Sequence, residues 1–293
     1  MEGQVVMGLQ KLRVMIGSTT AIGLRALARL PHGTRLIGLA ASYPVIERWL
    51  RALLCVYQPF PDIETATKYI RRFIPAGHEH SDVVSQLKQF ADVTRESDYP
   101  VLFYLSGYAP GLSRVFDLGG GIGNLFYPYD RELRLPATLR WMVHDLPDKE
   151  EIVLQFAQSR HENRIGFSRR MEDASGVDLF IVSGALHYFE DELAVILARL
   201  AELPRLVVVN RTPFSRADPI VTTQVGDGYV HACKLHSLAA TIAGMEAVGY
   251  RLVARWPVHE RASRVPLRPD LNDTYWGLFF VLEADRRRRD ASL

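Results

Sequence analysis

The sequence has little cysteine and little net charge. Its 293 residues include two cysteines, Cys55 and Cys233, which lie far apart and match neither a disulfide framework nor a metal-ligand spacing. We therefore expect no metal site and a reducing compartment, the cytoplasm. The net charge of +2 is too small to indicate a nucleic-acid or membrane partner, so we expect neither.

Long apolar runs are missing as well. Lys11, Arg13, Arg25 and Arg29 interrupt the apolar residues near the N-terminus, so no stretch reaches the ~18 residues that a membrane span needs. The same interruptions give a poor fit to a secretory signal. Hydrophobic residues make up 48% of the chain and charged residues 23%, which is typical of a globular protein.

Helical patterns dominate the first part of the chain. Residues 45–58 carry apolar side chains at helical spacing, and prolines follow directly. A second helix is expected over 81–90, with Ser81 as its cap. Residues 13–23 resemble a strand and glycine turn but lack the Gly-Lys-Ser/Thr of a phosphate loop, so we expect helix or loop there. The glycines and proline of 106–113 predict a linker. The sequence therefore predicts a helical N-terminal region over 1–111.

The pattern changes in residues 112–293, where short β-rich runs alternate with helical patterns. A helix is expected from Leu193 to Leu203, and another over 237–248. Such alternation predicts an α/β, Rossmann-like domain with a mostly parallel sheet and helices on both faces. We expect one antiparallel strand from the C-terminal pair. The expected strands are 114–118, 140–144, 164–167, 178–183, 205–210, 251–256 and 275–282.

A glycine turn follows the first of these strands. Asp117 ends the β-run, and Gly119, Gly121 and Gly123 follow at alternate positions. Glycine allows positive φ and a close approach of backbone to a ligand. The dinucleotide fingerprint G-x-G-x-x-G fails, because Asn124 stands where its third glycine belongs. The pattern D-x-G-x-G-x-G fits in full, and it resembles the class I S-adenosylmethionine (SAM)-dependent methyltransferases.

That resemblance implies a seven-stranded sheet whose last strand is inserted antiparallel, with SAM as the cofactor. It also implies that Asp117 faces the methionine end of SAM. We expect the turn, including Gly120, to hold the cofactor. A nicotinamide-dependent oxidoreductase and a non-catalytic SAM-fold binding module stay open as alternatives.

Two further corners of the sheet predict cofactor contacts. Asp145 stands just past the second strand, where a carboxylate can accept hydrogen bonds from both ribose hydroxyls. Asp145 as a mere helix cap remains the alternative. Asp145 and Leu146, followed by proline, also resemble the same corner of small-molecule O-methyltransferases. After the third strand, the class I fold would bring Met171, Glu172 and Asp173 to the adenine, unless they form a plain surface loop.

The segment after the fourth strand begins at Ser183, where we expect another cofactor contact. His187 lies where the methyl acceptor would bind, and it could take a proton from an acceptor hydroxyl. A similar histidine is catalytic in small-molecule O-methyltransferases. His187 as a wall of the cofactor pocket or a substrate contact, and His187 without a role in the site, are the other interpretations. Base-modifying nucleic-acid methyltransferases commonly have Asn/Asp-Pro-Pro-aromatic here, which residues 183–186 do not match, so we expect a small-molecule or saccharide acceptor and transfer to oxygen.

Residues 114–283 also resemble a narrower group of bacterial methyltransferases whose substrate is not established. The match includes Arg211-Thr212-Pro213-Phe214 after the fifth strand. It further includes residues 116–120, Trp141, Thr222, Gln224 and Tyr229. This group often has glutamine at the position of His187, which counts against the role of that residue as base.

We expect three residues, Tyr188, Arg211 and Gln224, to contact the acceptor. From chain order, Tyr99, Phe103 and Tyr104 are candidates for the wall of the acceptor pocket.

Overall fold

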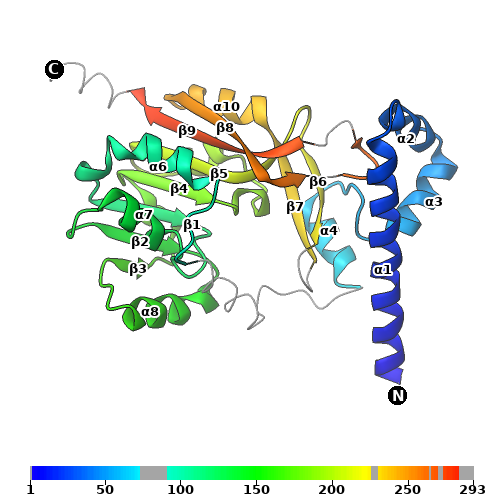
Figure 1. The fold of residues 1–293 in the computed structure, drawn as a ribbon, viewed down its shortest axis with the longest axis horizontal. Coiled ribbons are helices and arrows are strands. Elements are labelled where there is room, and N and C mark those ends of the chain that lie inside the picture. The colour runs from blue at the N-terminus through cyan, green and yellow to red at the C-terminus, as the bar shows by residue number, and fades with distance from the viewer. Residues whose placement is uncertain (1, 73–90, 226–229, 264, 270–272, 284–293) are drawn as a thin grey trace. The chain divides into compact units, whose positions relative to one another are not determined.

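A computed structural model describes residues 2–72, 91–225, 230–263, 265–269 and 273–283. The chain forms two compact units, which are described separately (Figure 1). The helical unit comprises Met1–His78, Phe214–Leu238 and Ala262–Asp273. The sheet unit comprises Glu79–Pro213, Ala239–Arg261 and Thr274–Leu293. Each unit groups the segments that pack against one another in space. The domain boundary expected after residue 111 stays a prediction.

The helical unit is built from four described helices and a β-hairpin. The helices are α1 (Glu2–Ala28), α2 (Gly33–Ala41), α3 (Pro44–Leu54) and α4 (Ile63–Ile70), and the hairpin is β6 (Ile220–Val225) with β7 (Val230–Ser237). Gly17 of α1 lies against α3, where a Cβ would come within 2.5 Å of the Leu54 carbonyl oxygen. Residues 13–23 are therefore helical, which is one of the two conformations expected for them. The close packing of α1 on α3 explains why Gly17 has no side chain.

The sheet unit contains the seven expected strands. They are β1 (Arg114–Leu118), β2 (Arg140–His144), β3 (Ile165–Phe167), β4 (Leu179–Ser183), β5 (Leu206–Ser215), β8 (Tyr250–Ser263) and β9 (Asp273–Leu282). They pair in the order β3-β2-β1-β4-β5-β9-β8. The first five are mutually parallel, whereas β9 is antiparallel to β5. The prediction of a mostly parallel α/β sheet with an inserted antiparallel strand is confirmed.

The remaining described elements of the sheet unit are helices and short 3₁₀ turns. The helices are α6 (Asp98–Ser106), α7 (Phe126–Leu133), α8 (Glu150–Ser159), α9 (Leu193–Ala198) and α10 (Leu238–Ala247). The 3₁₀ turns are η1 (Ala109–Gly111), η2 (Pro147–Lys149), η3 (Met171–Ala174) and η4 (Leu186–Tyr188).

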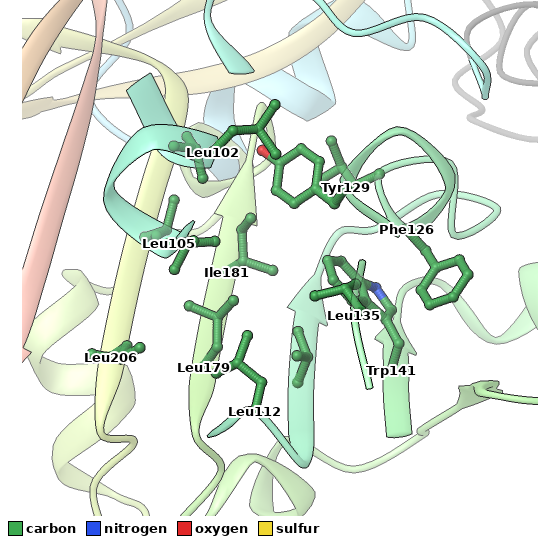
Figure 2. Close-up of a cluster of buried hydrophobic side chains, with 14 of the residues drawn as sticks. Leu102, Leu105, Leu112, Phe126, Tyr129, Leu135, Trp141, Leu179, Ile181 and Leu206 are labelled. Carbon is green, nitrogen blue, oxygen red and sulfur yellow. The ribbon is translucent and has the colours of Figure 1, made fainter. Parts of the chain in front are cut away.

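Alternating side chains divide the core of the sheet unit between its two faces. Leu179 and Ile181 of β4 pack on the face that α6 and α7 cover, together with Leu102 and Tyr129 (Figure 2). Phe180 points to the opposite face, where its ring stacks on that of Phe116 with centroids 5.7 Å apart. Since the central parallel strands are buried on both faces, they read as continuous apolar runs in the sequence.

Two helix ends differ from expectation. The helix predicted to reach Leu203 ends at Ala198, because the following backbone bonds to another loop: Gly176 N–H donates to the Glu202 carbonyl, and Glu202 N–H donates to Ser175. The helix predicted over 45–58 ends at Leu54, before the prolines.

One further expectation is wrong, one element of the structure was not predicted, and one prediction lies outside the described residues. The predicted linker at 106–113 is wrong, since it contains η1 and its Ala109 and Leu112 are buried in the core. The hairpin β6–β7 was not predicted, although 220–223 is rich in β-branched residues. The helix expected after Ser81 lies outside the described residues.

The contact between β9 and β8 gives a stability prediction. A Cβ at Gly277 would lie 2.1–2.4 Å from atoms of the buried Trp256 indole, so Gly277→Ala should lower the free energy of unfolding by roughly 1–3 kcal/mol through overpacking. Gly107→Ala is the control, because Gly107 has negative φ and nothing within 4 Å of its Cβ position. Equal stabilities of the two variants in urea unfolding would refute the close contact.

Candidate functional site

The carboxyl ends of four parallel strands meet at one edge of the sheet. In the register of the sheet, Leu118 of β1 lies beside His144 of β2 and Val182 of β4, and Ser183 lies beside Asn210 of β5. The segments that follow these strands therefore start side by side. Ligands of open α/β sheets bind at this edge.

The glycine turn begins there with three residues in the left-handed region. Gly119, Gly121 and Gly123 have φ of +67°, +61° and +77°. A Cβ on Gly119 would lie 2.2 Å from the Cβ of Ala185, which directly excludes a side chain. The Gly119 N–H donates to the His144 carbonyl at 2.7 Å, and this bond ties the turn to the end of β2. The predicted glycines thus form a side-chain-free concave backbone.

Asp117 is buried beneath this turn. Its side chain has no exposed surface, and its Oδ2 accepts a 3.0 Å hydrogen bond from Trp141 Nε1. Its Oδ1 has no partner among the described residues. Burial raises the pKa of Asp117 to about 7, further raised by the charge of Asp145 and opposed by the Trp141 bond. A carboxyl in this state favours a cationic ligand, because a positive charge stabilises its ionised form.

Asp145 closes the turn from the end of β2. Its Oδ2 accepts from Gly121 N–H at 2.8 Å and its Oδ1 from Leu146 N–H at 2.7 Å. Asp145 is half-buried and Leu146 is exposed. These bonds go to Gly121 and to Leu146, which precedes η2, rather than to N–H groups inside η2 or α8, which counts against the helix-capping interpretation of Asp145. Each carboxylate oxygen can accept two hydrogen bonds and here accepts one, which leaves capacity for ribose hydroxyls.

The segment after β3 forms η3, which contains all three predicted adenine contacts. Asp173 Oδ2 accepts from Ser168 Oγ at 2.8 Å, so this side chain is held inside its own loop. Met171 and Glu172 line a cavity of about 500 Å³ that also includes Phe189, Glu190, Asp191, Ile196, Arg199 and Leu200. The structure thus brings the η3 loop and the segment after β4 to one cavity, and their contact with adenine stays a prediction.

His187 lies in η4 after β4 and is 2% exposed. Its ring centroid is 4.1 Å from that of Tyr188 and 6.3 Å from that of Tyr275, which meets it edge-on. Ser183 ends β4, and its buried Oγ has no partner among the described residues. The histidine therefore sits in an aromatic environment close to the strand end, and its role stays a prediction.

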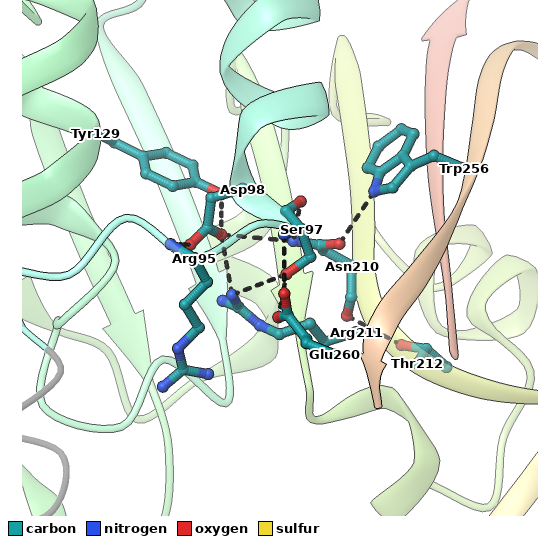
Figure 3. Close-up of polar contacts among 9 residues, drawn as sticks. All are labelled: Arg95, Ser97, Asp98, Tyr129, Asn210, Arg211, Thr212, Trp256 and Glu260. Atoms are coloured by element: carbon teal, nitrogen blue, oxygen red, sulfur yellow. Dashed lines mark hydrogen bonds and ion pairs between the residues drawn. The ribbon is translucent and has the colours of Figure 1, made fainter. Parts of the chain in front are cut away.

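Arg211 occupies a bulge in β5. The pairing with β9 shifts register between Val209 and Thr212, and Arg211 has φ of +49°. Its Nη1 lies 3.0 Å from Oδ1 of Asp98 in a buried ion pair (Figure 3). Left-handed backbone at a non-glycine residue costs of order 1–3 kcal/mol, and bulges often re-aim side chains beside functional sites. The substrate role of Arg211 stays a prediction, since Asp98 already binds part of its guanidinium.

The ion pair belongs to a larger buried network at the start of α6. Asp98 also accepts from the Tyr129 hydroxyl at 3.1 Å. Asn210 Nδ2 donates to the Ser97 carbonyl at 3.1 Å, and Ser97 Oγ donates to Glu260 at 2.6 Å (Figure 3). These bonds hold the N-terminus of α6 against the middle of β5, at its bulge.

Several predicted site residues are not brought to this edge within the sheet unit. Gln224 belongs to β6 of the helical unit, so its contact with substrate stays a prediction. Tyr229 lies outside the described residues. Tyr104 is not an open wall residue, because it stacks on Trp256 and Phe279 of the core. Tyr99 and Phe103 are exposed on α6.

Sequence reasoning missed two contributions to the site. Trp141 was noted only as part of a family match, and its bond to Asp117 follows from the in-register pairing of β1 with β2. Asp98 and Ser97 gave no signal, because their partners on β5, Asn210 and Arg211, lie more than a hundred residues away in the chain. The apolar strand around Trp141 offered a hint, since a buried indole N–H needs an acceptor.

Comparisons with known proteins give distant structural likeness. No family model and no curated protein matches the chain. A similar solved structure is the 1,6-didemethyltoxoflavin-N1-methyltransferase of Burkholderia thailandensis with S-adenosylhomocysteine (SAH), which is 19% identical, has a TM-score of 0.44 and covers 76% of this chain and 92% of its own. Magnesium protoporphyrin IX methyltransferase from Synechocystis with SAH is 17% identical, with TM-score 0.44 and coverages of 85% and 99%. Likeness at this level does not carry an activity over to this chain.

The buried Asp117 makes stability depend on pH in an unusual direction. Its folded pKa of about 7 lies above the unfolded value, so the folded state holds the proton more tightly and the free energy of unfolding falls as pH rises from about 4 to about 7. Asp117→Asn should remove this fall and make the variant more stable than the natural protein at pH 8, by on the order of 2 kcal/mol.

Chemical denaturation at pH 5 and pH 8 measures the effect. Asp148→Asn, at an aspartate with a 48% exposed side chain, is the control. If the Asp117 variant lost stability between pH 5 and pH 8 as steeply as the natural protein, the account of this carboxyl would be wrong.

Proposed function

We propose that the protein is a SAM-dependent methyltransferase that transfers a methyl group to oxygen of a small molecule or saccharide. The observation that carries the proposal is the glycine turn at the carboxyl end of β1. There, left-handed glycines lie directly above the buried Asp117, and Asp145 closes the turn from β2.

The residues of this turn fit SAM in charge and shape. SAM carries a sulfonium and an ammonium group, and Asp117 offers a buried carboxyl oxygen without a partner among the described residues. The backbone at Gly119 leaves no room for a side chain, so the main chain itself would line the cofactor. Asp145 has acceptor capacity left for the ribose. A nicotinamide cofactor lacks an ammonium group to pair with Asp117, and the third glycine of its fingerprint is replaced by Asn124.

When bound, SAM would supply an electrophilic methyl group on sulfur. The protein's own task is then to hold the acceptor in line with that methyl, and positioning alone lowers a barrier by several kcal/mol. His187 follows β4, where the acceptor would bind, and its imidazole can take the proton of an acceptor hydroxyl. The buried setting of His187 keeps water away from this proton transfer.

Two features support a small, neutral acceptor in a reducing compartment. The cavity beside η3 has Glu172, Glu190 and Asp191 against a single Arg199 in its lining, and this acidic excess would repel a phosphate backbone. Cys55 and Cys233 are buried thiols that form no disulfide, which favours the cytoplasm.

Calorimetric titration with SAM, SAH and NAD tests the assignment. We expect SAM and SAH to bind and NAD to be ignored. Asp145→Ala removes acceptors of the ribose and of Gly121 N–H, so it should weaken SAM binding by on the order of 10²-fold. Asp92→Ala is the control, because Asp92 has a 61% exposed side chain and pairs with Arg160 rather than with the glycine turn.

The outcomes separate the classes of function. NAD binding without SAM binding would identify an oxidoreductase and overturn the proposal. SAM binding without methyl transfer to any acceptor from a metabolite library would favour a binding module. An unchanged SAM affinity in a folded Asp145→Ala variant would remove Asp145 from the cofactor site.

Substitution of His187 tests its role as base. His187→Ala and His187→Gln should both keep SAM affinity, while turnover falls by about 10²–10⁴ and the acidic limb of the pH–rate profile disappears. Glutamine preserves hydrogen bonding and cannot titrate, so it separates proton transfer from simple contact with the substrate. A nearly active His187→Gln enzyme would make His187 a pocket wall and point to an acceptor that needs no base.

A further inference from the structure

Helix α1 of the helical unit is dark blue in Figure 1. Its side chains form two apolar faces. One face is buried: Gly17 and Ala21 pack inward, and Val14 and Leu24 pack against the core around Leu54. The opposite face is exposed to solvent and carries apolar residues three or four positions apart from Leu9 to Ile16, followed by Ile22 and Leu27. Its members, which we call the α1 stripe, are Leu9, Leu12, Met15, Ile16, Ile22 and Leu27, each 37–63% exposed.

The α1 stripe is long and continues into neighbouring segments. At 1.5 Å per residue, Leu9 to Leu27 spans about 27 Å along the helix. Further exposed apolar side chains follow on the turn after α1, on α2 and on α3: Leu30, Leu36, Leu39, Tyr43, Val45, Ile46 and Trp49. A surface helix of a globular protein ordinarily has a polar outer face. An apolar outer face of this length marks an interaction surface.

Basic side chains accompany this surface. Residues 9–58 contain seven Lys and Arg residues and a single acidic residue, Glu47. The whole chain, by contrast, contains 35 Lys and Arg residues and 33 Asp and Glu residues. By helical geometry Lys11 borders the stripe on one side and Arg13 on the other. Glu47 is itself paired with Arg51 at 2.6 Å. The whole-chain charge of +2, on which the expectation of no membrane partner rested, conceals this local excess.

The charge pattern decides between occupants. No described side chain of α1 is acidic, so two copies of the stripe placed face to face would bring like charges together. An anionic lipid surface satisfies both features, because apolar side chains enter the acyl boundary while lysine and arginine reach the headgroups. The proposed contact differs from a transmembrane span, since none of the described helices is long and apolar enough to cross a bilayer.

We propose that the α1 stripe docks the protein on an anionic membrane surface, with α1 lying along the interface. The surface involves neither the glycine turn nor His187, so it is independent of the proposed methyl transfer. An acceptor drawn from the lipid phase would be compatible with such docking.

Vesicle flotation with the full chain tests the proposal. Binding is expected to phosphatidylcholine vesicles that contain phosphatidylglycerol, to be at least tenfold weaker to phosphatidylcholine alone, and to decline as NaCl is raised. Leu12→Glu should weaken binding to anionic vesicles at least tenfold. Leu154→Glu is the matched control, because Leu154 of α8 and Leu12 are both helical and both 45% exposed.

A second variant protects the test against misfolding. Lys11→Gln with Arg13→Gln changes exposed residues and should weaken anionic binding roughly 25-fold, at about fivefold per charge. Circular dichroism and SAM titration check that every variant is folded.

Three results would overturn the proposal. The first is that the protein binds neither kind of vesicle. The second is that Leu12→Glu and Leu154→Glu weaken binding to anionic vesicles equally. The third is that the protein binds no vesicle and forms a concentration-dependent dimer, which Leu12→Glu dissociates. The last result would assign the stripe to a second copy of the chain.

Discussion

The parallel pairing of β1 with β2 on one side and β4 on the other is the constraint on which the site depends. It buries β1 on both faces and brings the strand ends to one edge in register. Asp117 is consequently enclosed, with Trp141 of the neighbouring strand as its hydrogen-bond donor. The chain then has to change direction directly above the buried carboxyl, where there is little space. Only glycines with left-handed backbone allow this, because they have no side chain.

The same edge of the sheet holds two costly features. Asp117 keeps a carboxyl in surroundings that disfavour its charge, and Arg211 holds left-handed backbone at a bulge. Neither stabilises the fold by itself. The network of Ser97, Asp98 and Asn210 holds the bulge in place, because its donors and acceptors are paired within the core. Costs of this kind gather where a protein binds or reacts with a ligand, since the binding partner can offset them.

The two units differ in how much of the apolar surface of their helices and strands they bury. In the sheet unit, alternating side chains send apolar groups into both faces of the sheet, and helices such as α6 and α7 cover them (Figure 2). In the helical unit, α1 uses one apolar face for its own core and leaves the other in solvent. Composition averaged over the chain resembles that of any globular protein, so this asymmetry becomes visible only when burial is assigned residue by residue.

The sequence by itself determined the α/β class, the positions of the seven strands of the sheet unit and the glycine turn, because strand periodicity and glycine spacing are local properties of the chain. It also indicated Asp145 and His187, since both directly follow strands. It missed the hairpin β6–β7, the early end of α9 and the bonds from Trp141 and Asp98. Those features were decided by tertiary structure, because each depends on which distant backbone or side chain lies opposite, and sequence spacing carries no record of that.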